Sequence, residues 1–350
     1  MGDRDSEAIR RACTRFVTAW SVPSPPDRDR YGEGGAVERL EARIAELLGK
    51  EAATYFPSGT MAQQVALRIH CERAGTRTVA FHPQCHLEVH EEMGYVHLHG
   101  LQARLVGDRN RLITLETLEG ITEPVGALLL ELPQRDLGGE LPPWDDLVAQ
   151  TEWARRRDIA LHLDGARLWQ CEPFYDKSLA EIAALFDTVY VSLYKDLGGL
   201  GGCLLAGPEE VVAESRVWRI RHGGRLASAE PYALSGLRGL DEVLPRMPEL
   251  VAKARDLGDA LARVDGVHVV PDPPQVAMLH VYVEGELERV REAALDIAEE
   301  TSTLIAGGFA PTPLPTVQRT EIGVGIRTLE VPSPDVAELY ADLVRRAATG

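Results

Sequence analysis

The sequence HLDGARLW, residues 162–169, begins inside the short apolar run Ile159–Leu163 and places Asp164 directly after that run. A second apolar run, Thr188–Leu193, is followed two residues later by Lys195. Short apolar runs of this kind are typical of strands in a buried parallel sheet. Because ligands of open α/β sheets bind beyond the carboxyl ends of the strands, we expect Asp164 and Lys195 to face one crevice.

An aspartate and a lysine placed in this way have the chemistry that pyridoxal phosphate requires. The lysine forms a Schiff base with the cofactor, and the carboxylate keeps the pyridine nitrogen protonated. An ion pair at the ends of two neighbouring strands would use the same two residues. Asp164 and Lys195 alone therefore leave both interpretations open.

A phosphate-binding turn is indicated upstream of this pair. Ala52–Phe56 is typical of a strand, and Ser58, Gly59 and Thr60 lead directly into a helix. The unpaired N–H groups and positive dipole of a helix N-terminus attract phosphate, and glycine lets the phosphate approach closely. An ordinary N-cap by serine or threonine explains the same residues, so this turn alone also leaves two interpretations open.

The order of the other predicted elements is that of an α/β protein followed by a smaller α+β unit. Further strands are predicted at Thr78–Phe81, Val125–Glu131 and Cys203–Ala206, and helices at Val37–Leu47 and Asp145–Arg157. Beyond residue 249 we predict helices at Leu250–Val264, Leu287–Ala306 and Ser333–Ala347, and strands at Val267–Val270, Ala277–Val283 and near Ile322–Leu329. The predicted organisation is a proline-rich N-terminal arm (residues 1–30), a large domain (31–248) and a small C-terminal domain (249–350).

Composition restricts the partners and the compartment. A net charge of −17 argues against nucleic acid and against an anionic membrane surface as partners. The five cysteines are scattered and form no C-x-x-C pair, which is typical of reduced thiols in the cytoplasm. No membrane span is predicted. His86 and His90 are four residues apart, but their order with Glu91 is not that of a zinc motif, so we predict no metal site.

Taken together, these segments resemble the threonine aldolase family of the β-eliminating lyase superfamily, whose members are fold-type-I pyridoxal-phosphate enzymes. The resemblance rests on Tyr31–Glu33, Glu41–Glu51, the FPSGTMA sequence of residues 56–62, HLDGARLW, and the spacing to Lys195. It covers about residues 31–245 well and the last hundred residues weakly. It implies an α/β fold in which the large domain has a mostly parallel seven-stranded sheet and the smaller C-terminal domain is α+β.

The resemblance also implies roles for individual residues. Ser58, Gly59 and Thr60 would hold the cofactor phosphate, Asp164 would pair with the pyridine nitrogen, and Lys195 would form the Schiff base. His86 would stack on the pyridine ring close to the substrate, and Arg167 would lie beside the cofactor. Arg167 and Arg327 would bind the substrate α-carboxylate. The residues expected to take part in catalysis are Lys195, His86 and Asp164.

Several positions depart from the family pattern. The family has a histidine near the substrate β-hydroxyl where this chain has Gln134, which can form a hydrogen bond with a hydroxyl but cannot act as a base. Tyr194 and Asp196 flank Lys195 in place of serine and glycine, and His90 stands where an aromatic residue is common. Arg225 lies one position from a family arginine that reaches the phosphate of the neighbouring subunit.

The expected activity is that of a pyridoxal-phosphate lyase. It would cleave the Cα–Cβ bond of a β-hydroxy-α-amino acid such as L-threonine or L-allo-threonine to glycine and an aldehyde. The departures leave β-elimination, transaldol exchange or another reaction at Cα open, and a non-catalytic binding protein of the same fold is a more distant alternative. A homodimer or homotetramer is expected, with a small amino acid as the only other partner.

Overall fold

The computed structural model describes residues 29–349, so the predicted arm lies outside the described residues except for Asp29 and Arg30. Within residues 29–349 a central sheet has seven strands in the order β1-β7-β6-β5-β4-β2-β3. Strand β7 is antiparallel to both β1 and β6, and the other pairs are parallel. The predicted mostly parallel seven-stranded sheet is therefore confirmed. The strands are β1 (Ala52–Phe56), β2 (Thr78–Phe81), β3 (Gln102–Leu105), β4 (Ala127–Glu131), β5 (Ala160–Gly165), β6 (Thr188–Ser192) and β7 (Cys203–Gly207).

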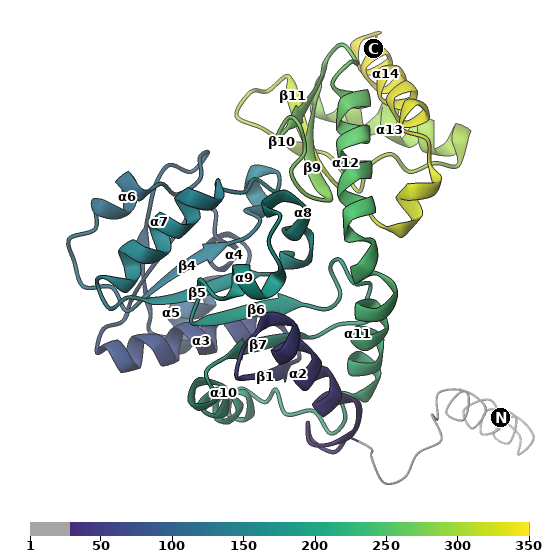
Figure 1. Ribbon diagram of the computed structural model, residues 1–350. Helices are drawn as coiled ribbons and strands as arrows, with labels where there is room; N and C mark the ends of the chain where they lie inside the picture. Colours follow the sequence, from purple (N-terminus) through teal and green to yellow (C-terminus); the bar gives the residue numbers. More distant parts are fainter. Residues whose placement is uncertain (1–28, 350) are drawn as a thin grey trace, which may run out of the picture.

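Helices cover both faces of the central sheet (Figure 1). Every strand except β3 is therefore largely buried. Neighbouring residues of a strand pack into different cores: Tyr55 belongs to one hydrophobic cluster and Phe56 to another. One face carries α3 (Gly59–Ala74), α4 (His86–Val89), α5 (Gly94–His99) and α10 (Glu209–Arg221). The other carries α2 (Gly35–Leu48), α6 (Leu115–Glu119), α7 (Trp144–Arg155), α8 (Glu172–Tyr175), α9 (Leu179–Ala183) and α11 (Glu230–Glu242).

Helix α3 shows how the sequence positions the site. It buries Ala62, Val65 and Ile69, whose spacing places them on one face of the helix. Ser58 caps its start through a hydrogen bond that its hydroxyl accepts from the backbone N–H of Met61. The N-terminus of α3 therefore lies at the carboxyl end of β1, where the sequence predicted a phosphate-binding turn.

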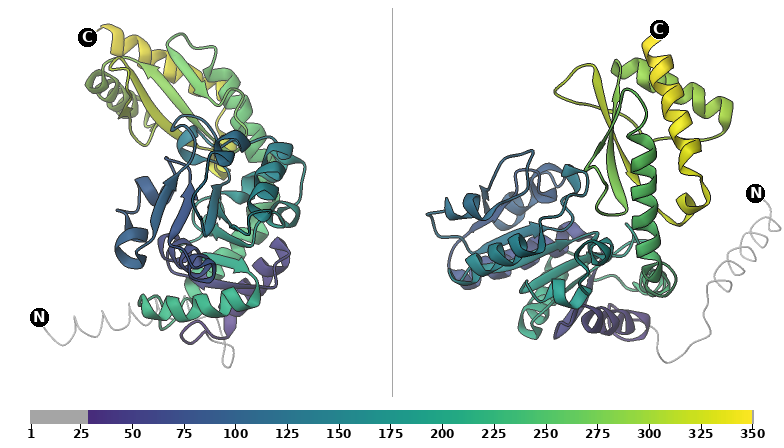
Figure 2. Two further views of the ribbon diagram at one scale, coloured as in Figure 1. Left: turned by 90° about the vertical axis from the view of Figure 1, so that its left-hand side faces the viewer. Right: turned by 45° about the horizontal axis from the view of Figure 1, so that its top comes forward.

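The C-terminal segment forms a second sheet, which we call the C-terminal sheet. Its four strands are antiparallel in the order β10-β11-β9-β8. Figures 1 and 2 show this sheet to one side of the central sheet, with α12 leading to it from α11 and running alongside it. The elements are α12 (Met247–Leu261), β8 (Val267–Val270), β9 (Met278–Glu284), α13 (Leu287–Thr301), β10 (Ala310–Pro311), β11 (Val317–Gly323) and α14 (Ser333–Thr349). No helix among residues 29–349 has the length and apolar character needed to cross a membrane.

Two predicted elements of this segment are wrong. The strand expected near Ile322–Leu329 ends at Gly323, and Ile326–Glu330 form a 3₁₀ helix, η4. The hydroxyl of Thr328 accepts a hydrogen bond from the backbone N–H of Gly325 and favours the turn. The helix expected at Leu287–Ala306 stops at Thr301, because Ser302 adopts a left-handed conformation with φ of 55°. The predicted domain boundary at residues 248 and 249 falls in the first turn of α12, and the division into domains stays a prediction.

Candidate active site

Asp164 lies at the carboxyl end of β5 and is 1% exposed. Its Oδ1 accepts a hydrogen bond from the backbone N–H of Ala166 at 3.1 Å, and its Oδ2 accepts one from Nε2 of Gln63 at 2.8 Å. None of the ion pairs among residues 29–349 involves Asp164. A buried carboxylate of this kind, hydrogen-bonded but without a cation, has the chemistry needed to bind a protonated ring nitrogen.

Lys195 follows β6 on the loop that Trp169 holds in place. The indole N–H of Trp169 donates to the backbone oxygen of Ser192 at 2.9 Å, which ties the HLDGARLW turn to the end of β6. Lys195 is half-buried and lines a cleft of about 170 Å³ with Arg167, Asp196 and Gly325, which we call the Lys195 cleft. In the described part of the chain, its amine forms no hydrogen bond and no ion pair, so it is available for covalent chemistry.

The buried carboxyl of Glu131 lies within reach of the charges of both Asp164 and Lys195. Burial and the charge of Asp164 raise the pKa of Glu131, and the charge of Lys195 opposes that rise. Glu131 is the register partner of Asp164 across the parallel pair β4–β5. Asp164 ends β5 and Lys195 follows the neighbouring strand β6, and their meeting in one crevice stays a prediction.

Ser58, Gly59 and Thr60 form the first turn of α3, and the side chains of Ser58 and Thr60 are exposed. Gly59 is tightly enclosed, since a Cβ atom there would lie 2.2 Å from the hydroxyl oxygen of Tyr190. Backbone N–H groups at the start of a 16-residue helix suit a phosphate. The N-cap interpretation is also realised, because Ser58 makes the capping bond to Met61.

His86, at the start of α4, is oriented by a buried carboxylate. Its Nδ1 lies 3.0 Å from Oε1 of Glu91, whose side chain is 1% exposed. The second oxygen of Glu91 accepts a hydrogen bond from Nε2 of Gln64 at 3.0 Å. Because Glu91, itself held by Gln64, occupies Nδ1, the Nε2 edge of His86 is the one left to face a ligand.

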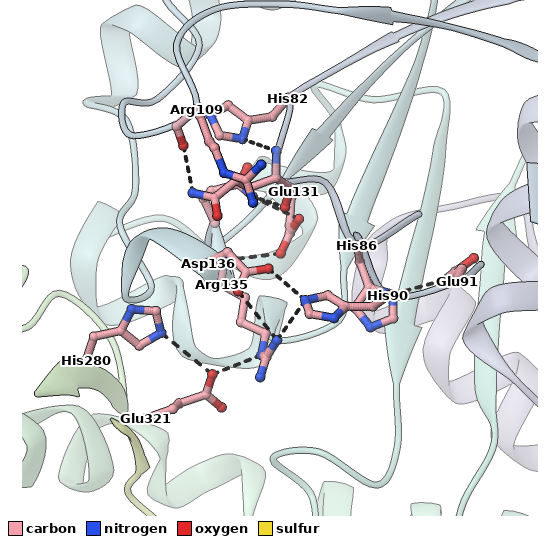
Figure 3. Close-up of polar contacts among 12 residues, drawn as sticks. His82, His86, His90, Glu91, Arg109, Glu131, Arg135, Asp136, His280 and Glu321 are labelled. Carbon is pink, nitrogen blue, oxygen red and sulfur yellow. Dashed lines mark hydrogen bonds and ion pairs between the residues drawn. The ribbon is translucent and has the colours of Figure 1, made fainter. Parts of the chain in front are cut away.

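Figure 3 shows a second polar network beside His86, built around Arg135. Nε2 of His90 lies 2.9 Å from Oδ2 of Asp136 and 3.2 Å from Nη1 of Arg135. Nε of Arg135 lies 2.9 Å from Oε2 of Glu321, which comes from β11 of the C-terminal sheet. This network joins the loop after β4 to the C-terminal sheet.

Arg167 extends the same network into the Lys195 cleft. Its Nη2 lies 3.4 Å from Oε1 of Glu321, and its Nε lies 4.0 Å from Oδ1 of Asp196. Burial opposes ionisation of Glu321, but the contact with His280 and the charges of Arg135 and Arg167 outweigh it and lower the pKa of Glu321 to about 2. Burial raises the pKa of Asp196 to about 6, although Arg167 opposes that rise. Arg167 is thus held between two carboxyl groups at the edge of the cleft.

Gln134 and Arg327 do not line the Lys195 cleft. Gln134 is 4% exposed, and its amide nitrogen donates to the backbone oxygen of Gln84 at 3.2 Å and to Glu131 at 3.0 Å. It lines a separate cavity of about 20 Å³. Arg327 is exposed on η4 and lines a neighbouring hollow of about 690 Å³ with Arg238.

Arg225 contacts the segment before α2, and Tyr194 is partly exposed to solvent. Nε of Arg225 donates to the backbone oxygen of Tyr31 at 3.3 Å, and its guanidinium also contacts Glu33 at 3.3 Å. Tyr194 is 46% exposed. The role of Arg225 at a neighbouring subunit stays a prediction.

The environment of Asp164 is the main evidence that these residues could bind pyridoxal phosphate. Asp164 is a buried carboxylate that has hydrogen bonds but no cation partner within residues 29–349, and a protonated pyridine nitrogen would provide that partner. The turn at Ser58, Gly59 and Thr60 would hold the phosphate, and Lys195 offers an amine. The described residues contain no group of three or more histidine, cysteine, aspartate or glutamate side chains arranged to hold a metal ion.

Several residues of the site were not identified from the sequence. Gln63 and Gln64 are both buried on α3. Two consecutive amide side chains among the apolar residues of this helix are a sequence signal for buried polar partners, because buried amides need hydrogen bonds. Glu91 follows His86 within one short segment. Glu321 gives no local signal, because it meets Arg167 only through the tertiary fold, 154 positions away.

Comparison with known proteins places the chain among lyases. The family model described as "Beta-eliminating lyase" matches residues 24–285. A candidate L-allo-threonine aldolase of Listeria monocytogenes EGD-E is 40% identical, covers 93% of this chain and 90% of its own, and superposes with a TM-score of 0.88. A candidate aromatic amino acid beta-eliminating lyase/threonine aldolase of Exiguobacterium sp. 255-15 is 38% identical over 94% of this chain and 93% of its own, also with a TM-score of 0.88. Low-specificity L-threonine aldolase 1 of Arabidopsis thaliana is 26% identical over 87% of this chain and 86% of its own.

Proposed function

Because this chain belongs to the beta-eliminating lyase family, we propose that it is a pyridoxal-phosphate-dependent lyase that cleaves the Cα–Cβ bond of a β-hydroxy-α-amino acid to glycine and an aldehyde. The observation that carries this proposal is the buried carboxylate of Asp164 at the end of β5, which has hydrogen bonds but no cation partner among residues 29–349. The names of the relatives point to threonine or L-allo-threonine as the substrate type.

When bound, pyridoxal phosphate withdraws the electrons of a bond at Cα into its protonated ring. Asp164 keeps that ring protonated by accepting the hydrogen bond of its nitrogen. Gln63 and the N–H of Ala166 hold the Asp164 carboxylate in place for this task. Lys195 would supply the amine that holds the cofactor covalently.

Arg167 binds the α-carboxylate of the substrate. A guanidinium group binds a carboxylate through two parallel hydrogen bonds, and Arg167 already faces the carboxylate of Glu321 at 3.4 Å. Glu321 therefore marks the side from which a carboxylate approaches, and it retains Arg135 as a partner when the substrate engages Arg167. His86, whose Nδ1 is held by Glu91, would cover the cofactor ring.

A second candidate function is another reaction at Cα on an amino acid, such as β-elimination or transaldol exchange. It is favoured by Gln134, which is not a base and whose amide nitrogen is already bound within the protein. The Exiguobacterium relative carries a name that includes both an eliminating lyase and an aldolase.

An absorption and product assay tests the proposal. We expect the purified protein with pyridoxal phosphate to show a near-visible band that shifts when glycine is added, and to release aldehyde and glycine from L-threonine or L-allo-threonine. Lys195→Ala should abolish covalent attachment as detected by borohydride reduction, whereas Lys177→Ala, at a half-buried lysine that pairs with Glu181, should not. Release of ammonia and a keto acid in place of aldehyde would favour the second candidate.

We further propose a homodimer or homotetramer in the cytoplasm, with Arg225 reaching the cofactor phosphate of a neighbouring subunit. The compartment is supported by Cys71, Cys85, Cys171 and Cys203, all of which are buried free thiols. Light scattering on the purified protein measures the assembly. A monomer that retains full activity would contradict this part of the proposal.

A further inference from the structure

Two histidines of one short helix face two different carboxylates. His86 starts α4 and contacts Glu91, whereas His90 ends it and contacts Asp136. Their ring centroids are 5.1 Å apart. Figure 3 shows the rings of His86 and His90 close together, with Glu91 on one side and Asp136 on the other. These two histidine–carboxylate pairs adjoin each other, and the function proposed above uses only the one at His86.

The partners of His90 all lie on one edge of its ring. Asp136 lies 2.9 Å from Nε2 and accepts its N–H, whereas Arg135, which can only donate, is farther from the same nitrogen at 3.2 Å and also lies 3.7 Å from Oδ1 of Asp136, so we take it as a charge beside this pair and not as a donor to Nε2. Asp136 has a side chain that is only 9% exposed, so its carboxylate is fixed in place. Nδ1 of His90 has no hydrogen-bond partner among residues 29–349, and 38% of the side chain is exposed.

This arrangement is that of an oriented base. A carboxylate that accepts the Nε2–H bond of a neutral imidazole selects the tautomer whose lone pair lies on Nδ1. The lone pair of His90 then points away from Asp136, and Asp136 stabilises the imidazolium that forms when Nδ1 takes a proton. Asp136 is thus a positioning residue for His90.

Contacts connect His90 both to the residue assigned to the cofactor and to the residue assigned to the substrate α-carboxylate. On one side its ring adjoins that of His86, which is assigned to the cofactor. On the other side, contacts run from His90 to Arg135, from Arg135 to Glu321, and from Glu321 to Arg167, which is assigned to the α-carboxylate. His90 therefore lies between the two groups that orient the substrate.

We propose that His90 is the base that accepts the proton of the substrate β-hydroxyl, an inference that rests on the proposed aldolase function. Gln134 cannot serve, because an amide is not a base and its nitrogen is bound to Gln84 and Glu131. His86 is oriented by Glu91 in the same way, but its ring is assigned to stacking on the cofactor, which leaves His90 as the oriented histidine without another role.

In this step the O–H bond of the β-hydroxyl breaks and its proton passes to Nδ1 of His90. The electron pair of that bond forms the C=O bond of the aldehyde, while the Cα–Cβ bond breaks and leaves its pair at Cα. Glycine then gains one proton at Cα, which equals the proton that the hydroxyl lost. His90 returns to the neutral form, so the reaction consumes no co-reactant.

The test compares His90→Gln and Asp136→Asn with the matched control His97→Gln, which changes an exposed histidine of α5. In protein without cofactor, ¹⁵N NMR of labelled histidines at pH 8 should show the Nε2–H tautomer for His90 and less of it in Asp136→Asn. With pyridoxal phosphate, His90→Gln should release aldehyde from L-threonine and L-allo-threonine about 10²–10⁴-fold more slowly. Exchange of the glycine α-proton with solvent should stay within about twofold, because it needs no base at the β-hydroxyl.

The outcomes separate the two proposals. Aldehyde release by His90→Gln at the wild-type rate, or an Nδ1–H tautomer in the wild-type protein, would overturn the assignment of His90 and leave the aldolase function standing. A parallel loss of glycine exchange in His90→Gln would also overturn it, since the residue would then be structural. A wild-type protein that exchanges the glycine α-proton but releases no aldehyde would refute the aldolase function itself, and the assignment of His90 would be lost with it.

Discussion

Replacing Glu321 with glutamine should destabilise the protein at pH 7 and remove a part of its acid sensitivity. Glu321 lies on β11 and binds Arg135 at 2.9 Å and Arg167 at 3.4 Å, so it holds the C-terminal sheet against the loops after β4 and β5. Its pKa is lowered from 4.5 to about 2 in the folded protein, against the effect of burial, by His280, Arg135 and Arg167. The ionised form is therefore stabilised by folding.

The size and the sign of this change in unfolding free energy follow from the linkage between proton binding and folding. Lowering a pKa from 4.5 to about 2 corresponds to about 3 kcal/mol, since one pH unit is about 1.4 kcal/mol. Because 28% of the Glu321 side chain is exposed and solvent screens its charge, we expect about 1–2 kcal/mol. This contribution is fully present above pH 4.5 and is lost as the pH falls through about 2.

Urea unfolding of the wild-type protein and Glu321→Gln between pH 7 and pH 3 measures this effect. The difference in unfolding free energy should be constant from pH 7 to about pH 5 and should shrink below pH 4.5. Glu284→Gln is the matched control, because Glu284 pairs with His268 on the same sheet but is 57% exposed, and it should change stability by less than about 0.5 kcal/mol. Equal stability of wild type and Glu321→Gln at pH 7, or a difference that does not change with pH, would refute the reasoning.

Two further substitutions test the cofactor site. Gly59→Ala places a Cβ atom 2.2 Å from the hydroxyl oxygen of Tyr190. It should therefore lower the thermal midpoint of unfolding and weaken pyridoxal phosphate binding at least about 10-fold. The control Gly307→Ala should do neither, because no atom lies within 4 Å of its Cβ position. A Gly59→Ala protein that binds the cofactor normally would contradict the enclosed turn. Glu91→Gln removes the carboxylate that holds His86, so it should lower kcat about 10-fold and move the pH profile; unchanged kcat and pH profile would argue against that orienting role.

The parts of this protein that could be predicted from sequence are those whose signals are local. Asp164 was placed at a strand end because an apolar run stops there, and β5 does end at Asp164 and Gly165. Strands β1 and β2 have the predicted bounds, because each is a short apolar run between polar residues. The start of α3 was found because Ser58 is a typical capping residue.

What could not be predicted depends on contacts between distant segments. Glu321 is an ordinary polar residue of a strand until the fold brings it to Arg135 and Arg167. Gln134 was expected at the substrate because of its position after β4. Its environment is set instead by the neighbouring carboxyl of Glu131 and the backbone of Gln84, which no local pattern reveals.

The two groups of site residues come from different parts of the fold, and this separates cofactor binding from the choice of reaction. Asp164, Lys195 and the turn before α3 are fixed by the packing of the central sheet, which changes little without loss of stability. His90, Arg135 and Asp136 lie on α4 and on the loop after β4, where the network to Glu321 holds them. Because the bond that breaks at Cα depends on how the substrate is oriented and on which group takes its proton, substitutions in this second group should change the reaction while the cofactor stays bound.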